Sequence, residues 1–426
     1  MRILYLSQYF PPEVGATQTR AYEMARGLVQ AGHQVTMLTE VPNHPSGIVQ
    51  PDYRRRLWVR RTHEGLDVLH GWVWASPHKN FVNRMAFYLS YMAGATLMGL
   101  LLARGRYDAI YCTSPPLFAG GAGLALRFLR RTPLIFEVRD LWPESAVEMG
   151  ELHNRWAIQL SAWLAEQCYR HSRHIVVVTE GIRQSLIAKG VPPAKIDLIA
   201  NGANTELFQP QPTAAASLRQ QLNLTDAFVV VYAGILGLAQ GLETVLAAAA
   251  ALQSQPHIQF LFVGTGPREQ ALHEYARHLA LTNVHFLGQQ PREAMPAYLS
   301  LADVAVVPLR DVPVFEGALP SKLFDAWACE CPTLTSIRGE AQNLVEQAGA
   351  GRFVSPESPA ELAVAILALS EQPAERKEMG QRGRAFVSQH YSRQAQARRL
   401  VTLLEDVTRE IVNRRDAENA ERRKSR

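Results

Sequence analysis

Cysteine is scarce in this sequence. The four cysteines in 426 residues are Cys112, Cys168, Cys329 and Cys331. So few cysteines in so long a chain do not form a disulfide framework, and they favour a reducing compartment. Cys329 and Cys331 stand one residue apart, without a second pair or a histidine cluster nearby. We therefore expect them to pack a helix end and not to bind zinc.

A strong charge imbalance is also lacking. The 44 Lys and Arg residues against 39 Asp and Glu residues give a formal net charge of +5. This excess is too small for a dedicated nucleic-acid binder and suits an anionic small molecule or an anionic membrane surface. With 47% apolar residues, the chain has enough hydrophobic content for two or three domain cores.

The N-terminus has no recognisable export signal. "MRILYLSQYF" carries one Arg, and its short apolar run is broken by Ser7 and Gln8. We therefore expect a buried strand here and a cytoplasmic protein.

A second apolar stretch, Met85–Ala103, has 19 uncharged residues, which is long enough to span a bilayer. It stands between two predicted strands of one sheet. We therefore favour a core helix, then a helix with one lipid-touching face, over a true span. The preceding "YRRRLWVRR" is either a solvated loop or a contact to anionic lipid.

Strand and helix patterns alternate along most of the chain. The first 45 residues read as strand, Pro/Gly loop, helix and strand, which predicts a parallel sheet. After a small-residue link at 196–221 the pattern restarts with "FVVVYAGILG", "IQFLFVGTG" and "ADVAVVPL". We predict an α/β protein of two doubly wound, Rossmann-like domains.

The domain boundaries follow from this pattern. We expect one domain at residues 1–200 and a second at 201–385. A closing helix at 386–412 should return to the first domain, and the charged tail at 413–426 should be frayed or disordered.

Glycine-rich loops follow several predicted strands. In doubly wound folds ligands bind where the carboxyl ends of the strands meet, and glycine lets backbone N–H groups approach a phosphate. Any one of these glycines could serve only as a turn residue. Together they predict a phosphate site, and they are Gly15, Gly234, Gly237, Gly264 and Gly266.

The segment "LPSKLFDAWACECPTLTS" at 319–336 adds polar groups to the same edge. We expect a helix that begins at Pro320 and Ser321, with Ser321 as its cap. Free N–H groups and Lys322 would hold a diphosphate, and Asp325, one turn further, would accept bonds from ribose hydroxyls. The alternative is a surface helix whose Asp is favoured by the helix dipole alone.

Several motifs in this order resemble the retaining GT-B glycosyltransferases of glycosyltransferase family 4. They are "GHQVTMLT", "ANGANTELF", "VYAGILGLAQGLETVL", "FLFVGTGP", "VHFLG" and "PSKLFDAWACECPTLTS". "DLWPES" and "EVPNHPSG" are similar to the fucosamine-type transferases of capsule, O-antigen and colanic-acid assembly. The resemblance implies two domains facing across a cleft, with a UDP-type sugar held mainly by the C-terminal one.

The resemblance also implies donor contacts. Asp325 takes the place of the second Glu of the family's paired-glutamate motif, which holds ribose. Leu287 and Gly288 fall where backbone groups hold the base, and Gly15 falls where a loop amide meets the diphosphate. Relatives carry Arg and Lys at positions that are Ile235 and Gln240 here. Lys322 and then Arg310 are the candidates to replace that charge.

The implied contacts to the transferred sugar are less complete. Gly317 stands where the first motif Glu belongs, and its neighbour Glu316 is the candidate substitute. Arg139 and Asp140 fall where relatives place a polar group near the sugar, although Asp140 could also cap a helix. Arg20, on the first predicted helix, could meet a phosphate or the acceptor, or lie on a solvated face.

These residues imply transfer without a metal or another cofactor, because no Asp-x-Asp pair lies near a predicted cleft loop. The expected acceptor is a saccharide on a polyprenyl diphosphate, with the enzyme peripheral on the inner face of the membrane. An N-acetylated deoxyhexosamine is one candidate sugar. A UDP-sugar 2-epimerase and a non-catalytic nucleotide-sugar-binding subunit remain the alternatives.

Overall fold

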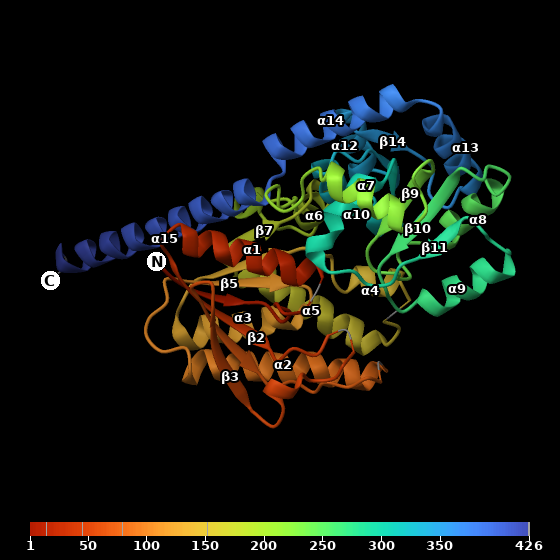
Figure 1. The fold of residues 1–426 in the computed structure, drawn as a ribbon. Helices are drawn as coiled ribbons and strands as arrows, with labels where there is room; N and C mark the ends of the chain where they lie inside the picture. Colours follow the sequence, from red (N-terminus) through yellow and green to blue (C-terminus); the bar gives the residue numbers. More distant parts are fainter. Residues whose placement is uncertain (14, 45, 79, 151, 425–426) are drawn as a thin grey trace. The chain divides into compact units, whose positions relative to one another are not determined.

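The chain forms two compact units, each built around its own mainly parallel sheet (Figure 1). The structure is a computed structural model and describes residues 1–424 apart from 14, 45, 79 and 151. The first unit holds residues 1–200 and 394–426, and the second unit holds residues 201–393.

The sheet of the first unit has eight strands in the order β3-β4-β2-β1-β5-β6-β7-β8. Its edge strand β3 pairs antiparallel with β4, and the other described pairs are parallel. The strands are β1 (Arg2–Leu6), β2 (Gln34–Glu40), β3 (Trp58–His63), β4 (Leu66–Gly71), β5 (Ala109–Ser114), β6 (Leu134–Val138), β7 (His174–Val177) and β8 (Ile196–Leu198).

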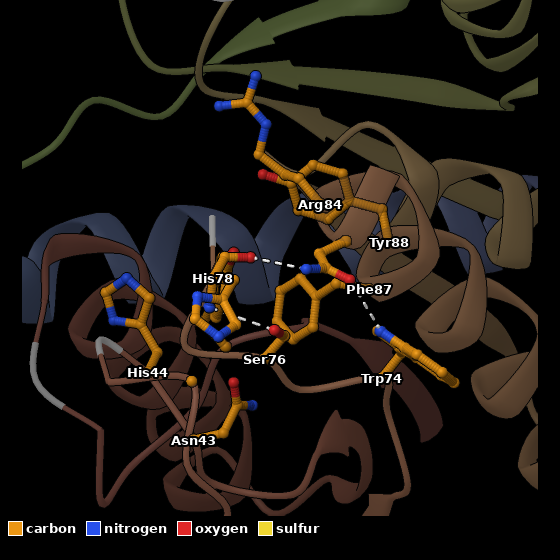
Figure 2. Close-up of a pocket in the computed structure, with 11 residues that line it drawn as sticks. Asn43, His44, Trp74, Ser76, His78, Arg84, Phe87 and Tyr88 are labelled. Carbon is orange, nitrogen blue, oxygen red and sulfur yellow. Dashed lines mark hydrogen bonds between the residues drawn. The ribbon is translucent and has the colours of Figure 1, made fainter. Parts of the chain in front are cut away.

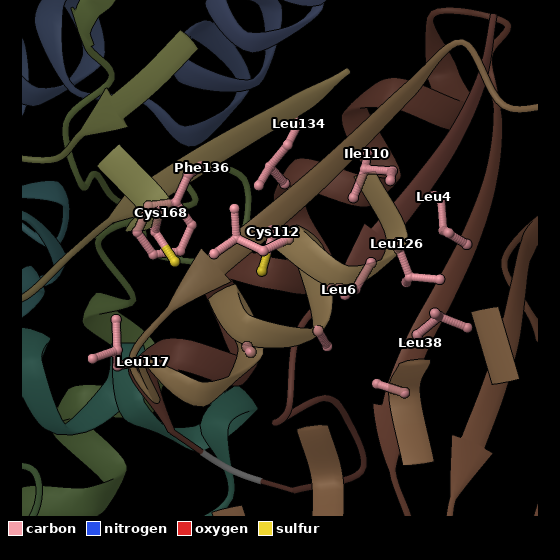
Figure 3. Packing of buried hydrophobic residues seen from close by; sticks show 14 of the residues in the cluster. Leu4, Leu6, Leu38, Ile110, Cys112, Leu117, Leu126, Leu134, Phe136 and Cys168 are labelled. Carbon is pink, nitrogen blue, oxygen red and sulfur yellow. The ribbon is translucent and has the colours of Figure 1, made fainter. Parts of the chain in front are cut away.

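Alternating residues of these strands form two cores. Ile3 and Tyr5 lie in a core with α1 (Ala16–Gln30) and α15 (Arg393–Lys424). Leu4 and Leu6 lie in the core on the opposite face, where Cys112 and Cys168 are packed among Leu and Phe side chains (Figure 3). The helices of that face are α2 (Phe81–Leu101), α3 (Phe118–Arg130), α5 (Arg155–His171) and α6 (Glu180–Ala188), and the short α4 (Glu144–Glu148) follows β6.

The sheet of the second unit has six parallel strands in the order β11-β10-β9-β12-β13-β14. They are β9 (Phe228–Ala233), β10 (Ile258–Val263), β11 (Val284–Phe286), β12 (Val304–Pro308), β13 (Thr333–Ser336) and β14 (Gly351–Phe353). The strand order reverses between β9 and β12, and such a switch point is where doubly wound folds bind ligands.

Helices cover both faces of this second sheet. One core includes side chains from α8 (Glu243–Ala251), α9 (Glu269–His278) and α13 (Pro359–Ser370). The opposite face carries α7 (Pro212–Gln221), α10 (Met295–Leu301), α11 (Ser321–Ala328) and α12 (Glu340–Ala348), and α14 (Pro373–His390) packs on α11.

The structure corrects four expectations. Part of the predicted Arg-rich loop is the edge strand β3, and the predicted link at 196–221 contains β8 and α7. The closing helix is broken between α14 and α15, because Tyr391 stacks on Phe324 at 4.6 Å and Ser392 bridges to Ala203. The tail, predicted to be frayed or disordered, continues α15 to Lys424.

The long apolar segment is confirmed as a helix and begins four residues earlier than predicted, at Phe81. Tyr91, Ala95, Met98 and Gly99 bury one side of α2 against the sheet. Within the described residues, no helix has the length and apolar character needed to cross a bilayer.

Candidate functional site

Loops from neighbouring strands of the second unit meet at the carboxyl edge of its sheet. Leu236 N–H, after β9, donates to the Thr265 carbonyl after β10 at 3.0 Å. Gly264 N–H donates to the Gly288 carbonyl after β11 at 2.8 Å. The predicted glycine loops of this unit are therefore one connected cluster beside the β9–β12 switch point.

Close packing between these loops explains two of the glycines. A Cβ on Gly264, whose φ is 143°, would lie 1.9 Å from the Gly234 carbonyl oxygen. A Cβ on Gly266 would lie 2.5 Å from the Leu236 carbonyl oxygen. Gly237 is less constrained, since its nearest neighbour is the flexible Gln240 side chain. Gly264 and Gly266 thus shape the loop cluster itself.

Lys322 brings a cation to this cluster. Its Nζ lies 4.0 Å from the centre of the Tyr232 ring and donates a hydrogen bond to the Tyr232 hydroxyl. Its Cε lies 2.5 Å from where a Cβ on Gly234 would stand. Burial lowers the pKa of Lys322 to about 7. The structure thus places Lys322 against the glycine loop after β9.

The helix that carries Lys322 begins one residue earlier than a Ser321 cap would require. Pro320 is the N-cap of α11 and Ser321 is its first residue, so the prediction of Ser321 as the cap is wrong. Within the described part of the chain, no side chain caps this end of α11. Leu323 N–H bonds to the Pro320 carbonyl at 3.1 Å, and the start of the helix adds its positive dipole end beside Lys322.

Asp325 lies on the same helix and faces a residue that sequence reasoning missed. Its Oδ1 is 3.9 Å from Arg393, whose Nε donates to the Gly202 carbonyl at 2.6 Å. The Asp325 side chain is 20% exposed. A ribose contact by Asp325 therefore remains a prediction, and it would be made beside an arginine.

Arg310 follows β12 and is a second cation of the cluster. Its N–H donates to the Ala239 carbonyl at 2.9 Å, and its Cγ lies 3.4 Å from where a Cβ on Gly241 would stand. Its Nε is buried and has no hydrogen-bond partner among the described residues. Glu316 is exposed in the loop between β12 and α11, where its carbonyl accepts from Glu340 N–H at 2.8 Å.

The predicted base contacts have protein partners already. Leu287 N–H donates to the Phe262 carbonyl at 2.9 Å, and the Leu287 carbonyl accepts from Gln290 Nε2 at 2.8 Å. The Gly288 carbonyl is engaged by Gly264. A base that binds the Leu287 carbonyl would have to share it with Gln290 or displace that side chain.

The first unit carries the remaining candidates. Gly15 is the N-cap of α1, and no side chain of the described residues caps the start of that helix. Arg139, after β6, has buried Nε and Nη1 atoms without a hydrogen-bond partner in the described part of the chain, and burial lowers its pKa to about 10. Asp140 accepts from the Ser145 hydroxyl at 2.9 Å, and burial raises its pKa. Asp140 is not the cap of the following helix, because Pro143 is the N-cap of α4.

Arg20 does not lie on a solvated face, and its charge is already paired within the protein. It is 5% exposed and pairs at 2.8 Å with the fully buried Glu137. It also donates to the carbonyls of Ile199 and Ala200, at 2.7 and 2.8 Å. Arg20 thus links residues 199–200 to Glu137 of β6 within the first unit, which is a structural use of its charge. The signal for this pairing was an acidic residue inside the apolar strand "LIFEV".

A cavity in the first unit was also missed. Figure 2 shows its lining side chains, which include His44, Trp74, His78 and Phe87. The signal was present in the sequence as histidine and tryptophan in the loops that follow β2 and β4.

Comparison with known proteins identifies the family. Residues 15–202 match the glycosyl transferase 4-like domain, and residues 215–386 match glycosyl transferases group 1. A putative colanic acid biosynthesis glycosyl transferase, WcaI of Escherichia coli, is 27% identical over 334 residues, which are 76% of this chain and 80% of that protein.

Solved structures show the same fold. Sucrose-phosphate synthase from Thermosynechococcus elongatus has a TM-score of 0.74 at 22% identity, over 95% of this chain and 98% of that chain. Anabaena HepE in complex with UDP and glucose has a TM-score of 0.71 at 20% identity, over 95% and 99%. These likenesses confirm the predicted GT-B fold, and the two matching domain models show that the chain is a glycosyltransferase of the family that pairs a glycosyl transferase 4-like domain with a group 1 domain.

Proposed function

We propose that this glycosyltransferase moves a sugar from a UDP-sugar to a lipid-linked saccharide during surface polysaccharide assembly, with retention of the anomeric configuration. The observation that carries the proposal is Lys322 beside the glycine loops at the β9–β12 switch point. HepE, which binds UDP, and the colanic acid relative support this donor and this pathway class. An N-acetylated deoxyhexosamine is the sugar that we would test first.

The proposed chemistry needs positioning and charge stabilisation. The bond from the anomeric carbon to the diphosphate breaks, and the acceptor oxygen bonds to the same face of that carbon. The acceptor's hydroxyl proton passes to the leaving phosphate oxygen. Lys322, Arg310 and the start of α11 would stabilise the diphosphate charge without a divalent metal. Arg139 and Glu316 would contact the transferred sugar.

The first unit supports peripheral attachment to the inner leaflet. Trp156, Leu160 and Trp163 follow one another on a single face of α5, and their exposures are 81%, 62% and 55%. Exposed leucines at 97 and 101 on α2 belong to the same helical layer. Tryptophan favours the membrane interface. Arg54, Arg55 and Arg56 are also exposed and would attract anionic lipid.

The experiment is a transfer assay with a panel of UDP-sugars, with and without a polyprenyl-diphosphate-linked saccharide. The anomeric configuration of the product is read by NMR. Acceptor-dependent UDP release with retention supports the proposal. Formation of a 2-epimer would show an epimerase, and binding of UDP-sugars without turnover would show a non-catalytic subunit.

A further inference from the structure

Arg393 is the last residue of the second unit, and its side chain faces Asp325. Its Nη2 is 3.9 Å from Asp325 Oδ1, and its Nε donates to the Gly202 carbonyl at 2.6 Å. The two side chains are 10% and 20% exposed, so water screens their charges only weakly. A guanidinium group can serve both partners at once, because its nitrogens are held in one plane. Arg393 therefore links Asp325 to the segment at which the chain enters the second unit.

The helix position of Arg393 is unfavourable for a positive charge. Arg393 is the first residue of α15, and the positive end of a helix dipole disfavours a cation there. Among the residues that the structure describes, the first turn of α15 holds no acidic side chain. Asp325, which belongs to a different helix, supplies the nearby negative charge. This arrangement indicates that the charge of Arg393 serves Asp325 and not its own helix.

The segment that ends in Arg393 is fixed against α11. The ring of Tyr391 stacks on that of Phe324, with the ring centres 4.6 Å apart and 19° between the planes. Ala203 N–H donates to the Tyr391 carbonyl at 3.0 Å, and Arg393 N–H donates to the Ala203 carbonyl at 2.8 Å. Phe324 directly precedes Asp325 on α11. The position of Arg393 relative to Asp325 is therefore set by stacking and by backbone hydrogen bonds.

This pairing leaves part of the Asp325 carboxylate accessible to a ligand. Oδ1 of Asp325 is buried, so the exposed part of the side chain belongs to its other atoms. An arginine beside one oxygen restricts the rotation of the carboxylate, which lowers the entropy lost when a ligand binds. Lys322, the proposed diphosphate contact, lies one turn earlier on the same helix.

We propose that Arg393 is a positioning residue for the donor nucleotide, holding the Asp325 carboxylate in the orientation that accepts hydrogen bonds from the ribose hydroxyls. The inference rests on the proposed function, because it requires a nucleoside diphosphate at Lys322. Arg393 itself does not touch the ligand, so its effect should depend on Asp325 and on the presence of the ribose hydroxyls.

The test measures the preference of the full chain for UDP over 2′,3′-dideoxy-UDP, as the ratio of their dissociation constants from calorimetry. Arg393→Gln removes the charge, and Arg393→Lys keeps it. The matched control is Arg384→Gln, because Arg384 donates to the Ala328 carbonyl at the other end of α11 at 2.7 Å and lies 3.7 Å from Glu330. Asp325→Ala, alone and combined with Arg393→Gln, completes a double-mutant cycle. Thermal unfolding shows which variants fold.

We expect Arg393→Gln to lower the ribose preference about fivefold to tenfold, because the carboxylate loses the group that orients it. Affinity for dideoxy-UDP should stay unchanged, which a general loss of structure would not allow. Arg393→Lys should lower the preference less, since one ammonium group cannot reach both Gly202 and Asp325. The control should keep the wild-type preference, and Arg393→Gln should cause no further loss in the Asp325→Ala background.

An unchanged ribose preference in the Arg393 variants that fold would overturn the inference. Equal losses for both ligands, an equal loss in Arg384→Gln or an additive loss in the double variant would also overturn it. If Asp325→Ala removes the preference while both Arg393 variants keep it, this inference alone fails. A wild type that binds UDP without preferring its ribose form would overturn the inference and leave the proposed donor intact, whereas a wild type that binds no UDP would overturn both.

Discussion

Lys322 lies over the face of Tyr232, with its ammonium nitrogen 4.0 Å from the ring centre. Within the described part of the chain, Lys322 forms no ion pair with a carboxylate. A cation–π contact stabilises the ammonium group without neutralising it. Tyr232 therefore positions a cation that an anionic ligand can still use, on the strand that leads into the Gly234 loop.

The pKa of Lys322 predicts how donor affinity depends on pH. Burial lowers this pKa to about 7 in the unliganded protein, and a bound diphosphate would raise it by favouring the charged form. Binding then takes up a proton above pH 7, so affinity should fall as the pH rises, by up to about tenfold per pH unit. The pH dependence of the affinity is measured by calorimetry with a UDP-sugar. The diphosphate of a UDP-sugar does not titrate near pH 7, so it does not contribute to the change. Lys322→Arg should flatten the profile, and a flat wild-type profile would contradict the prediction.

Asp325→Ala should weaken binding of UDP more than binding of its 2′,3′-dideoxy analogue. The carboxylate would lose its bonds to ribose hydroxyls, worth about 1.5–3 kcal/mol for charged hydrogen bonds. Because Asp325 also lies near Arg393, thermal unfolding must be measured separately from binding. If the variant still prefers the ribose form as strongly as the wild type, Asp325 does not hold the ribose.

Chelation should leave transfer unchanged. Lys322, Arg310 and the start of α11 would supply the positive charge that a divalent ion supplies in other transferases. The assay is repeated after dialysis against EDTA, and again with added Mg²⁺ or Mn²⁺. Activity that disappears with EDTA and returns with either ion would show that these residues are insufficient.

Replacing Trp156, Leu160 and Trp163 by Ser should reduce flotation with anionic liposomes. These side chains are exposed and would insert at the interface. Changing Arg54, Arg55 and Arg56 to Ser should remove part of the salt-sensitive binding, at about 1 kcal/mol for each Arg. A matched control is Val364→Ser, which changes an exposed apolar residue of the second unit. Equal losses in all three variants, or no flotation of the wild type, would contradict this prediction.

The sequence predicted the strands and helices whose apolar residues are buried in the cores. Strand β9 is a run of apolar residues, and the glycines that follow β9 and β10 located the loop cluster. The edge strand β3 was missed, because Arg60 and Arg61 give it the composition of a loop. Its place depends on pairing with β4, a contact that local composition does not show.

Side-chain partners distant in the sequence explain the other differences. Arg20 pairs with Glu137 because α1 packs on the sheet. Arg393, at the end of the second unit, lies near Asp325 of α11. Local patterns placed Lys322 and Gly234 at one edge, but they did not identify Tyr232 as the ring beneath Lys322. The cavity residues come from four separate segments, so no single motif revealed them.

The most direct test of this account is the affinity of UDP and of uridine for the wild type, Lys322→Ala and the exposed-residue control Lys377→Ala. We predict that Lys322→Ala weakens UDP binding by about 1.5–3 kcal/mol, the value of a charged hydrogen bond, and leaves uridine binding nearly unchanged. Lys377→Ala should bind both ligands as the wild type does. Equal UDP affinity in the wild type and Lys322→Ala would contradict the central claim that Lys322 holds the donor diphosphate.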